Sequence, residues 1–345
     1  MKRTIKLIPV IVLLLQIFPS FAQDPHFSQY RVNPTFVNPA NSGLNCDLRA
    51  TAGYRDQWKS VGTPFRTAVF SFDMNTSRSS KGRGSIGVGV QFLNDRAGDA
   101  RIAMTQGMVN VSGILKLSED SKLSMGLMGG FGQRSADYNG LRWDQQYTNG
   151  SFNQTALSGE TFSTPTHTYA DAGAGIAWSY GKDQGYITQN NGLKMNIGLA
   201  AYHFGLPQTS FLGSEEKLNT KFIAYASAEM GKQNSNLAII PEFYFVGQGS
   251  QREILFGSVF RYLLQEGSQF TGFLKSSAIS LGANYRWKDA VIPSLMIEYG
   301  TFAVGLSYDI TVSSLSTSNR ARGGFECMLT FKTPNPFSKV SRARI

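Results

Sequence analysis

The feature that most constrains this chain is an alternation of apolar with polar or small residues, which repeats through most of its length. In residues 193–204, for example, Leu193, Ile197 and Leu199 fall on one face, and polar or small residues lie between them. Because successive side chains of a β-strand point to opposite faces, this segment predicts a strand with one apolar side. Segments of roughly ten residues with this pattern are typical of strands that cross a bilayer at a tilt.

Fourteen segments carry this pattern, and an even number is usual in single-chain bacterial barrels. After residue 22 no stretch is long and apolar enough to span a membrane as a helix, which leaves a soluble β fold or a closed barrel. The 36 glycines, above the average usage of about 7 %, and the 16 % of charged residues favour the barrel. We therefore expect an all-β fold, a transmembrane antiparallel up-and-down β-barrel of about 14 strands. The predicted strands are residues 46–56, 65–75, 84–94, 101–117, 122–135, 168–180, 193–204, 221–230, 237–246, 252–264, 277–288, 291–299, 301–311 and 323–331.

The N-terminus has the layout of a secretory signal peptide. Lys2, Arg3 and Lys6 precede an apolar run over residues 7–18, and small residues at Ser20 and Ala22 suit cleavage before residue 23. The apolar run is shorter than the ~20 residues that a spanning helix needs. Residues 1–22 are therefore predicted to be removed on export.

The rest of the chain divides into an arm, a barrel and a tail. Residues 23–45 are polar and contain Pro25, Pro34 and Pro39, so they predict an irregular periplasmic arm or plug. Residues 46–331 form the predicted barrel. Residues 332–345 follow as a basic tail.

Connection lengths and aromatic residues suggest how the barrel sits in the membrane. With a periplasmic N-terminus, the short turn at residues 118–121 lies inside, and the long connections at residues 136–167 and 205–220 lie outside. Aromatic residues at strand ends suggest interfacial girdles. They are Tyr54, Trp58, Tyr169, Trp178, Tyr180, Tyr202, Phe204, Tyr285 and Trp287.

The net charge of +10 is dispersed rather than gathered on a helix or a nucleic-acid-binding motif. Nucleic acid is therefore not an expected partner. Anionic lipid headgroups or an acidic protein partner suit this charge better.

Ionisable residues also occur on the polar faces of predicted strands, where a membrane protein tolerates them only toward a lumen or a partner. They either line a channel or pair across a filled interior, and we favour a filled or narrow lumen. These residues are Asp171, Glu229, Glu253, Arg261, Glu298 and Asp309.

Histidine and cysteine give no sign of catalysis, of a metal site or of a cofactor. His203 shares its strand parity with Ile197 and Leu199 and is expected to face lipid or the interface. Cys46 and Cys327 belong to no metal-like cluster. Since they fall on the predicted first and last strands, they are either disulfide-bonded or two free buried thiols. No enzymatic activity is predicted.

Three ordered motifs follow the signal peptide: QDPHFSQY from residue 23, NP and NPA from residues 33 and 38, and YRDQW from residue 54. In this order and spacing they resemble the PorP/SprF family of Bacteroidota outer-membrane proteins. We expect the arm either to pack as a plug or mouth lining or to contact a partner. The candidate family-motif and partner-binding residues are Gln23, Asp24, Pro25, His26, Phe27, Ser28, Gln29, Tyr30, Asn33, Pro34, Asn38, Pro39, Tyr54, Arg55, Gln57 and Trp58.

The resemblance implies a non-enzymatic barrel of the type IX secretion and gliding apparatus. It implies that the protein anchors a secreted surface protein or adhesin, or assists its export, through the C-terminal domain of that cargo. It also implies contacts with periplasmic lipoproteins of the secretion system. The alternative is an outer-membrane channel for a small hydrophobic solute, plugged by the arm. Within YRDQW, Arg55 and Trp58 are expected to anchor a loop or to form a cation–π pair.

Overall fold

A computed structural model describes residues 24–60, 62–76, 84–137, 141–148, 150–159, 166–181, 192–209, 217–231, 235–266 and 275–333. The predicted signal peptide and most of the predicted basic tail lie outside these residues. Within them, no helix has the length and apolar character needed to cross a membrane.

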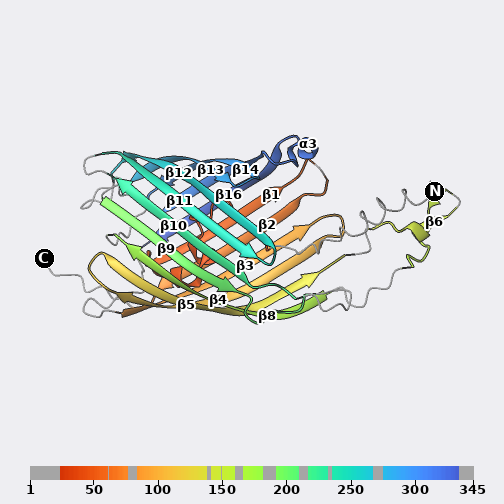
Figure 1. The fold of residues 1–345 in the computed structure, drawn as a ribbon, viewed down its shortest axis with the longest axis horizontal. Coiled ribbons are helices and arrows are strands. Elements are labelled where there is room, and N and C mark those ends of the chain that lie inside the picture. The colour runs from red at the N-terminus through yellow and green to blue at the C-terminus, as the bar shows by residue number, and fades with distance from the viewer. Residues whose placement is uncertain are drawn as a thin grey trace, which may run out of the picture.

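Fourteen antiparallel strands close into one barrel, each hydrogen-bonded to its neighbours in the chain (Figure 1). This confirms the predicted fold class and the predicted number of strands. The barrel strands are β1 (Leu48–Gln57), β2 (Phe65–Asn75), β3 (Gly84–Ala97), β4 (Ile102–Lys116), β5 (Ser121–Ser135), β8 (Thr166–Tyr180), β9 (Gly192–Tyr202), β10 (Lys221–Gly231), β11 (Leu237–Gln248), β12 (Gln251–Gln265), β13 (Ser277–Arg286), β14 (Ala290–Tyr299), β15 (Phe302–Thr311) and β16 (Arg322–Thr333).

The barrel closes where the first strand pairs with the last. β1 and β16 run antiparallel in one continuous register, from Leu48 opposite Thr333 to Gln57 opposite Gly324. β1 also pairs with β2 over its whole length, so its two edges are both satisfied. Such closure leaves no strand edge unpaired in hydrocarbon.

The two faces of the wall divide as the alternation predicts. Ile86, Leu127 and Leu199 project outward and are 52 %, 68 % and 58 % exposed. On the same strands, Gln91, Ser124 and Ala200 point into the barrel and are buried. The exposed apolar band is the surface that lipid covers.

The two ends of the barrel differ, and we name them by their connections. At the turn end, β1 begins and β16 finishes; at the loop end, residues 136–165 join β5 to β8 and residues 203–220 join β9 to β10. The small elements η2 (Asp144–Gln146), β6 (Tyr147–Thr148), β7 (Ser151–Phe152) and α3 (Ser316–Asn319) lie at the loop end (Figure 1). The elements α2 (Pro34–Val37) and η1 (Pro39–Asn41) belong to the arm.

Two expectations about girdle residues need correction. Tyr169 and Tyr202 are 5 % exposed and face the lumen, since they share their parity with Asp171 and Ala200, so they do not belong to an outer girdle. Of the two alternatives for the cysteines, the structure has free thiols at both Cys46 and Cys327, of which Cys46 is buried and Cys327 is partly exposed. Cys46 precedes β1, whereas Cys327 lies opposite Tyr54 in the middle of the wall, which separates the thiols.

A charge on the outer face tests the position of the lipid. We expect Leu127→Arg, midway along β5, to lower the free energy of unfolding by about 2–4 kcal/mol, because a cation at the bilayer midplane loses its hydration. Gln133→Arg, on the same face but near the strand end, should cost about 0–1 kcal/mol. Urea titration of the barrel in lipid vesicles, followed by tryptophan fluorescence, measures both. Equal costs would contradict a lipid-facing band.

Candidate functional site

The arm, residues 24–47, runs through the barrel lumen, and none of its residues is exposed. It starts at the loop end, where the backbone N–H of Asp24 donates to Oε1 of Gln248 over 3.0 Å. It reaches the turn end, where the N–H of Asn75 donates to the carbonyl of Asp47, just before β1 begins. The inner wall of the barrel is therefore largely a seat for the protein's own N-terminal segment.

The first motif is held by a carboxylate of the last strand. Glu326 of β16 is completely buried and accepts the backbone N–H groups of Ser28 and Gln29, over 2.6 and 3.1 Å. Oγ of Ser28 donates to Asp309 on β15 over 2.9 Å. Charge-assisted bonds of this kind are among the strongest that fix a backbone segment.

Arg55 joins the first motif to the third. Its side chain is 2 % exposed, donates to Oγ of Ser28 over 3.0 Å and pairs with Asp309 over 2.7 Å and with Glu326. It faces inward on β1, whereas Trp58 lies beyond the strand at φ 59° and packs edge-on against Phe65. Arg55 therefore anchors the arm rather than a loop and makes no cation–π pair with Trp58.

A second carboxylate repeats this arrangement nearer the turn end. Asp73 of β2 is fully buried, is bound in a fork by Arg49 of β1 over 2.9 and 3.0 Å, and accepts from Oγ1 of Thr35 and the N–H of Gly43. Each of these two wall carboxylates thus holds the arm while a β1 arginine neutralises it. A buried carboxylate is tolerated when it is paired and hydrogen-bonded in this way.

Beside these two anchors, aromatic, charged and apolar contacts fix the arm. The rings of Tyr30 and Tyr244 stack with centroids 4.6 Å apart. Arg31 donates to Glu242 over 3.2 Å. Phe27 packs in a buried apolar cluster with Val69, Leu93, Met104 and Met328.

The second motif forms two short turns pressed against the wall. Pro34 and Pro39 stand at the first positions of α2 and η1, where proline is favoured because its missing N–H is not needed. Asn38 caps η1 by accepting the N–H of Ala40 over 2.8 Å. Its amide donates to the carbonyls of Ile176 and Leu199, a residue pair of β8 and β9, over 3.0 and 3.1 Å.

Glycines of the inner wall make room for these turns. A methyl group added at Gly126 of β5 would overlap the backbone of Pro39 and Ala40. Gly87 on β3 and Gly175 on β8 are equally close to Ser42 and Asn38. Glycine within a strand often marks such a close approach, so these positions record the path of the arm.

His203 holds the start of the arm, contrary to the expectation that it faces lipid. It follows β9 at φ 64°, which breaks the strand parity and turns the ring inward, where it is 2 % exposed. Its Nδ1 lies 2.8 Å from Asp171 and its Nε2 lies 2.7 Å from Asp24. Nζ of Lys221 also lies 2.8 Å from Asp24. We call these four residues the latch.

The latch groups shift each other's protonation. Burial lowers the pKa of His203, but Asp24 and Asp171 outweigh it and raise the pKa above its ordinary value. Burial raises the pKa of Asp24, but Lys221 and His203 outweigh it and hold the pKa well below its ordinary value. Asp24 is therefore ionised near neutral pH and pairs with Lys221, and His203 keeps its proton to a higher pH than a free histidine does.

The motif residues separate into three groups. Those described from Asp24 to Pro39 lie inside the barrel, and Arg55 joins them there. Tyr54 points outward and is 41 % exposed. Gln57 and Trp58 stand at the loop-end mouth, and Gln23 lies outside the described residues. Sequence reasoning missed the wall residues that receive the arm, although their inward parity was a usable signal. They are Asp73, Glu242, Tyr244, Arg286 and Glu326.

The strand charges pair across a filled interior. Each of the six forms an ion pair with another described residue, and the distances are between 2.7 and 3.3 Å. The pairs are Asp171 with His203, Glu229 with Lys194, Glu253 with Arg286, Arg261 with Glu298, and Asp309 with Arg55.

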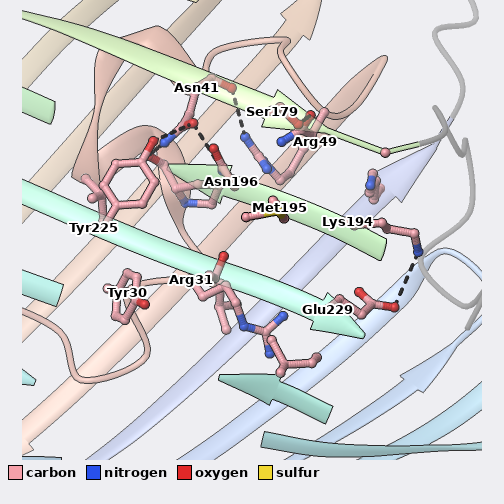
Figure 2. Close-up of a pocket in the computed structure, with 18 of the residues that line it drawn as sticks. Tyr30, Arg31, Asn41, Arg49, Ser179, Lys194, Met195, Asn196, Tyr225 and Glu229 are labelled. Atoms are coloured by element: carbon pink, nitrogen blue, oxygen red, sulfur yellow. Dashed lines mark hydrogen bonds and ion pairs between the residues drawn. The ribbon is translucent and has the colours of Figure 1, made fainter. Parts of the chain in front are cut away.

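Two of the cavities beside the arm lie at opposite ends of the barrel. One of about 270 Å³ lies at the turn end, between the arm and the inner wall, with Arg31, Lys194 and Glu229 among its lining residues (Figure 2). The other, of about 610 Å³, lies at the loop end above Asp24 and His26. Within the described part of the chain, no group of three or more His, Cys, Asp or Glu residues is arranged to hold a metal ion.

Comparison with known proteins identifies the family that the three motifs indicated. The profile of the PorP/SprF family, described as a type IX secretion system membrane protein, matches residues 20–331. No curated protein matches the chain.

Solved structures that the chain resembles include BamA of Haemophilus ducreyi lacking POTRA domains 1–3. It is matched at 11 % identity and a TM-score of 0.41, covering 84 % of this chain and 70 % of that one. CdiB of Acinetobacter baumannii is matched at 8 % identity and a TM-score of 0.40, covering 83 % of this chain and 60 % of that one. The chain thus spans less than two thirds of CdiB. Omp33 of Acinetobacter baumannii is matched at 10 % identity and a TM-score of 0.37, covering 84 % of this chain and all of that one.

A matched pair of substitutions on β5 tests whether the inner-wall glycines make room for the arm. We expect Gly126→Val to displace the arm, because the side chain would occupy the place of Pro39 and Ala40. Gly129→Val should leave the arm in place, because a Cβ at Gly129 on the outer face meets open space. Hydrogen exchange of residues 24–47, measured by mass spectrometry in detergent, compares them. Equal protection in both variants would contradict the packing of the arm against Gly126.

The latch predicts that the start of the arm is held most tightly in mildly acidic solution. The raised pKa of His203 adds stability that is complete below about 6.5 and is lost as the pH rises through the folded-state value. The lowered pKa of Asp24 adds stability that is present above about 3.9 and is lost as the pH falls.

Exchange of residues 24–30, corrected for intrinsic rates, should therefore be slowest between about pH 4 and 6.5. His203→Gln should flatten the alkaline side of this profile. An unchanged profile in that variant would show that another group controls the arm.

Proposed function

Because the chain belongs to the PorP/SprF family of type IX secretion system membrane proteins, we propose that it anchors a secreted surface protein, or assists its export, by binding the C-terminal domain of that cargo. The protein is an outer-membrane β-barrel. Family membership implies interaction with components of the secretion system and with cargo. Such family members are typically non-enzymatic.

The observation that carries this proposal is the filled lumen. The arm crosses the barrel from the loop end to the turn end, so the interior offers no wide passage for a polypeptide beside it. A barrel with an occupied interior contributes to secretion through its mouths rather than as a conduit. Binding at a mouth therefore accounts for the structure better than transport through it.

The loop end supplies the surface for cargo, since long connections of such barrels are extracellular. The hairpin β6–β7 projects from this end (Figure 1). Arg142 lies over the ring of Phe152, at 4.8 Å from its centroid. Tyr147 and Leu157 nearby are 50 % and 89 % exposed. Exposed aromatic and apolar side chains with an arginine are the usual anchors of a protein interface.

A channel for a small hydrophobic solute is the weaker alternative. Charged side chains line both cavities, among them Arg49 and Glu298 at the turn end and Arg134 and Glu253 at the loop end. Sites for hydrophobic ligands are lined mainly by apolar and aromatic groups.

The test uses the C-terminal domain of a large secreted protein encoded beside this barrel. We expect that domain, fused to a fluorescent protein, to bind the purified barrel, and Tyr147→Ala with Leu157→Ala to weaken binding roughly tenfold. The control pair Ser151→Ala and Gln154→Ala, the first in this hairpin and the second just after it, should bind normally. Failure of the wild-type barrel to retain the domain, together with solute leakage through it in liposomes, would favour the channel instead.

A further inference from the structure

The larger cavity, at the loop end, has the start of the arm as its floor. Asp24, Pro25 and His26 line it. Asp24 is held by the latch, and Nε2 of His26 lies 3.5 Å from Oε2 of Glu253 on β12. The volume of about 610 Å³ falls within the range of about 300–1,000 Å³ that is usual for ligand sites. A chain that enters from the loop end therefore reaches a closed floor.

The wall that β1 to β4 contribute is apolar near the mouth. Phe65 is the first residue of β2, and Ile102, opposite Ala97 of β3, is the first residue of β4. Trp58 is half-buried, and its ring centroid lies 5.1 Å from that of Phe65. All four side chains line the cavity. Apolar and aromatic groups around a few placed polar groups are typical of a ligand site.

One step deeper, the same wall carries two opposite charges that are held apart. Cross-strand pairs join Thr67 to Asp95, Asp95 to Met104, and Met104 to Arg134. All four residues line the cavity, and Met104 lies between the carboxylate and the guanidinium. Asp95 accepts from Oγ1 of Thr67 over 2.6 Å. Arg134 forms no ion pair or hydrogen bond among the residues that the structure describes.

Arg134 differs in this respect from the other arginines of the cavity. Arg55 and Arg286 are each held by Asp309 and by a further carboxylate. Arg252 is exposed to solvent near the start of β12. Arg134 is half-buried inside the barrel, so a carboxylate that binds there displaces no carboxylate of the wall.

We propose that this cavity receives the free carboxyl terminus of a peptide chain, with the terminal carboxylate on Arg134 and the last side chain against the apolar wall. The inference rests on the proposed function, since it takes this terminus to be the end of the cargo's C-terminal domain. Arginine binds a carboxylate through two parallel N–H groups. Capture of a chain terminus is a recurring mode of peptide recognition. Asp95 offers an acceptor to a backbone N–H of the same peptide.

Two other occupants fit less well. An internal segment of a chain would have to enter and leave through the same mouth, because the arm closes the other side. Membrane lipid reaches the outer face of the wall, whereas Asp95 and Arg134 line the cavity inside the barrel. A chain end is therefore the best match.

The test compares two forms of one peptide, which carries about the last ten residues of the cargo's C-terminal domain and an N-terminal fluorescein. One form has a free carboxyl terminus and the other is amidated. Fluorescence anisotropy measures their binding to the full-length barrel in detergent. We expect the amidated form to bind about tenfold more weakly, because amidation removes the charge that Arg134 holds. Arg134→Gln should weaken the free form by a similar factor and abolish the difference between the two forms.

The matched control is Arg66→Gln, which removes an exposed arginine of β2 at the same end of the barrel and should leave both affinities unchanged. Equal binding of the two forms to the unaltered barrel would overturn the proposal, and this comparison needs no variant to fold. A preference for the free form that survives in Arg134→Gln would also overturn it. Failure of the free form to bind would have the same meaning.

The outcome is separable from that of the cargo test. Retention of the whole domain that depends on Tyr147 and Leu157 but not on Arg134 refutes only this inference. A barrel that binds the free-acid peptide but does not retain the domain refutes the proposed function and leaves the cavity as a site for a chain terminus.

Discussion

Satisfying every backbone hydrogen bond in hydrocarbon is the constraint on which this structure depends. The chain meets it by pairing β1 with β16, and the closed wall then encloses an interior that must itself be filled. Small residues alone do not fill it. The arm does, and backbone groups of the arm are bound by carboxylates and by the Gln91 amide of the wall.

The buried carboxylates and arginines are needed because the arm fills the lumen. An irregular segment inside a barrel presents backbone N–H groups that have no strand partner, and buried Glu326 and Asp73 accept three of these groups and the Thr35 hydroxyl from the arm. Two buried carboxylates require compensation, which Arg55 and Arg49 on one strand supply. The arm motif and the YRDQW motif are therefore two sides of one contact, although 27 residues separate Ser28 from Arg55.

The sequence predicted the barrel wall better than it predicted what fills the lumen. Alternation such as that of Ile86 with Gly87 depends only on which face meets lipid, so it predicted strands and facing directly. The path of the arm depends on contacts such as Ser28 with Glu326, 298 positions apart, and no local pattern encodes them. The predicted orientation of His203 was wrong for a local reason. His203 itself has a positive φ, which turns its side chain to the face opposite the one that strand parity predicts, and parity cannot reveal such a residue.

Glu326 lies on the strand that is synthesised last, yet it grips one of the earliest residues of the described chain. The seat of the arm is therefore complete only when β16 has docked against β1, because Gly87, Gly126 and Gly175 of earlier strands supply the space and Glu326 of the last strand supplies the acceptor. Closure of the wall and fixation of the N-terminal segment are thus coupled in one structure.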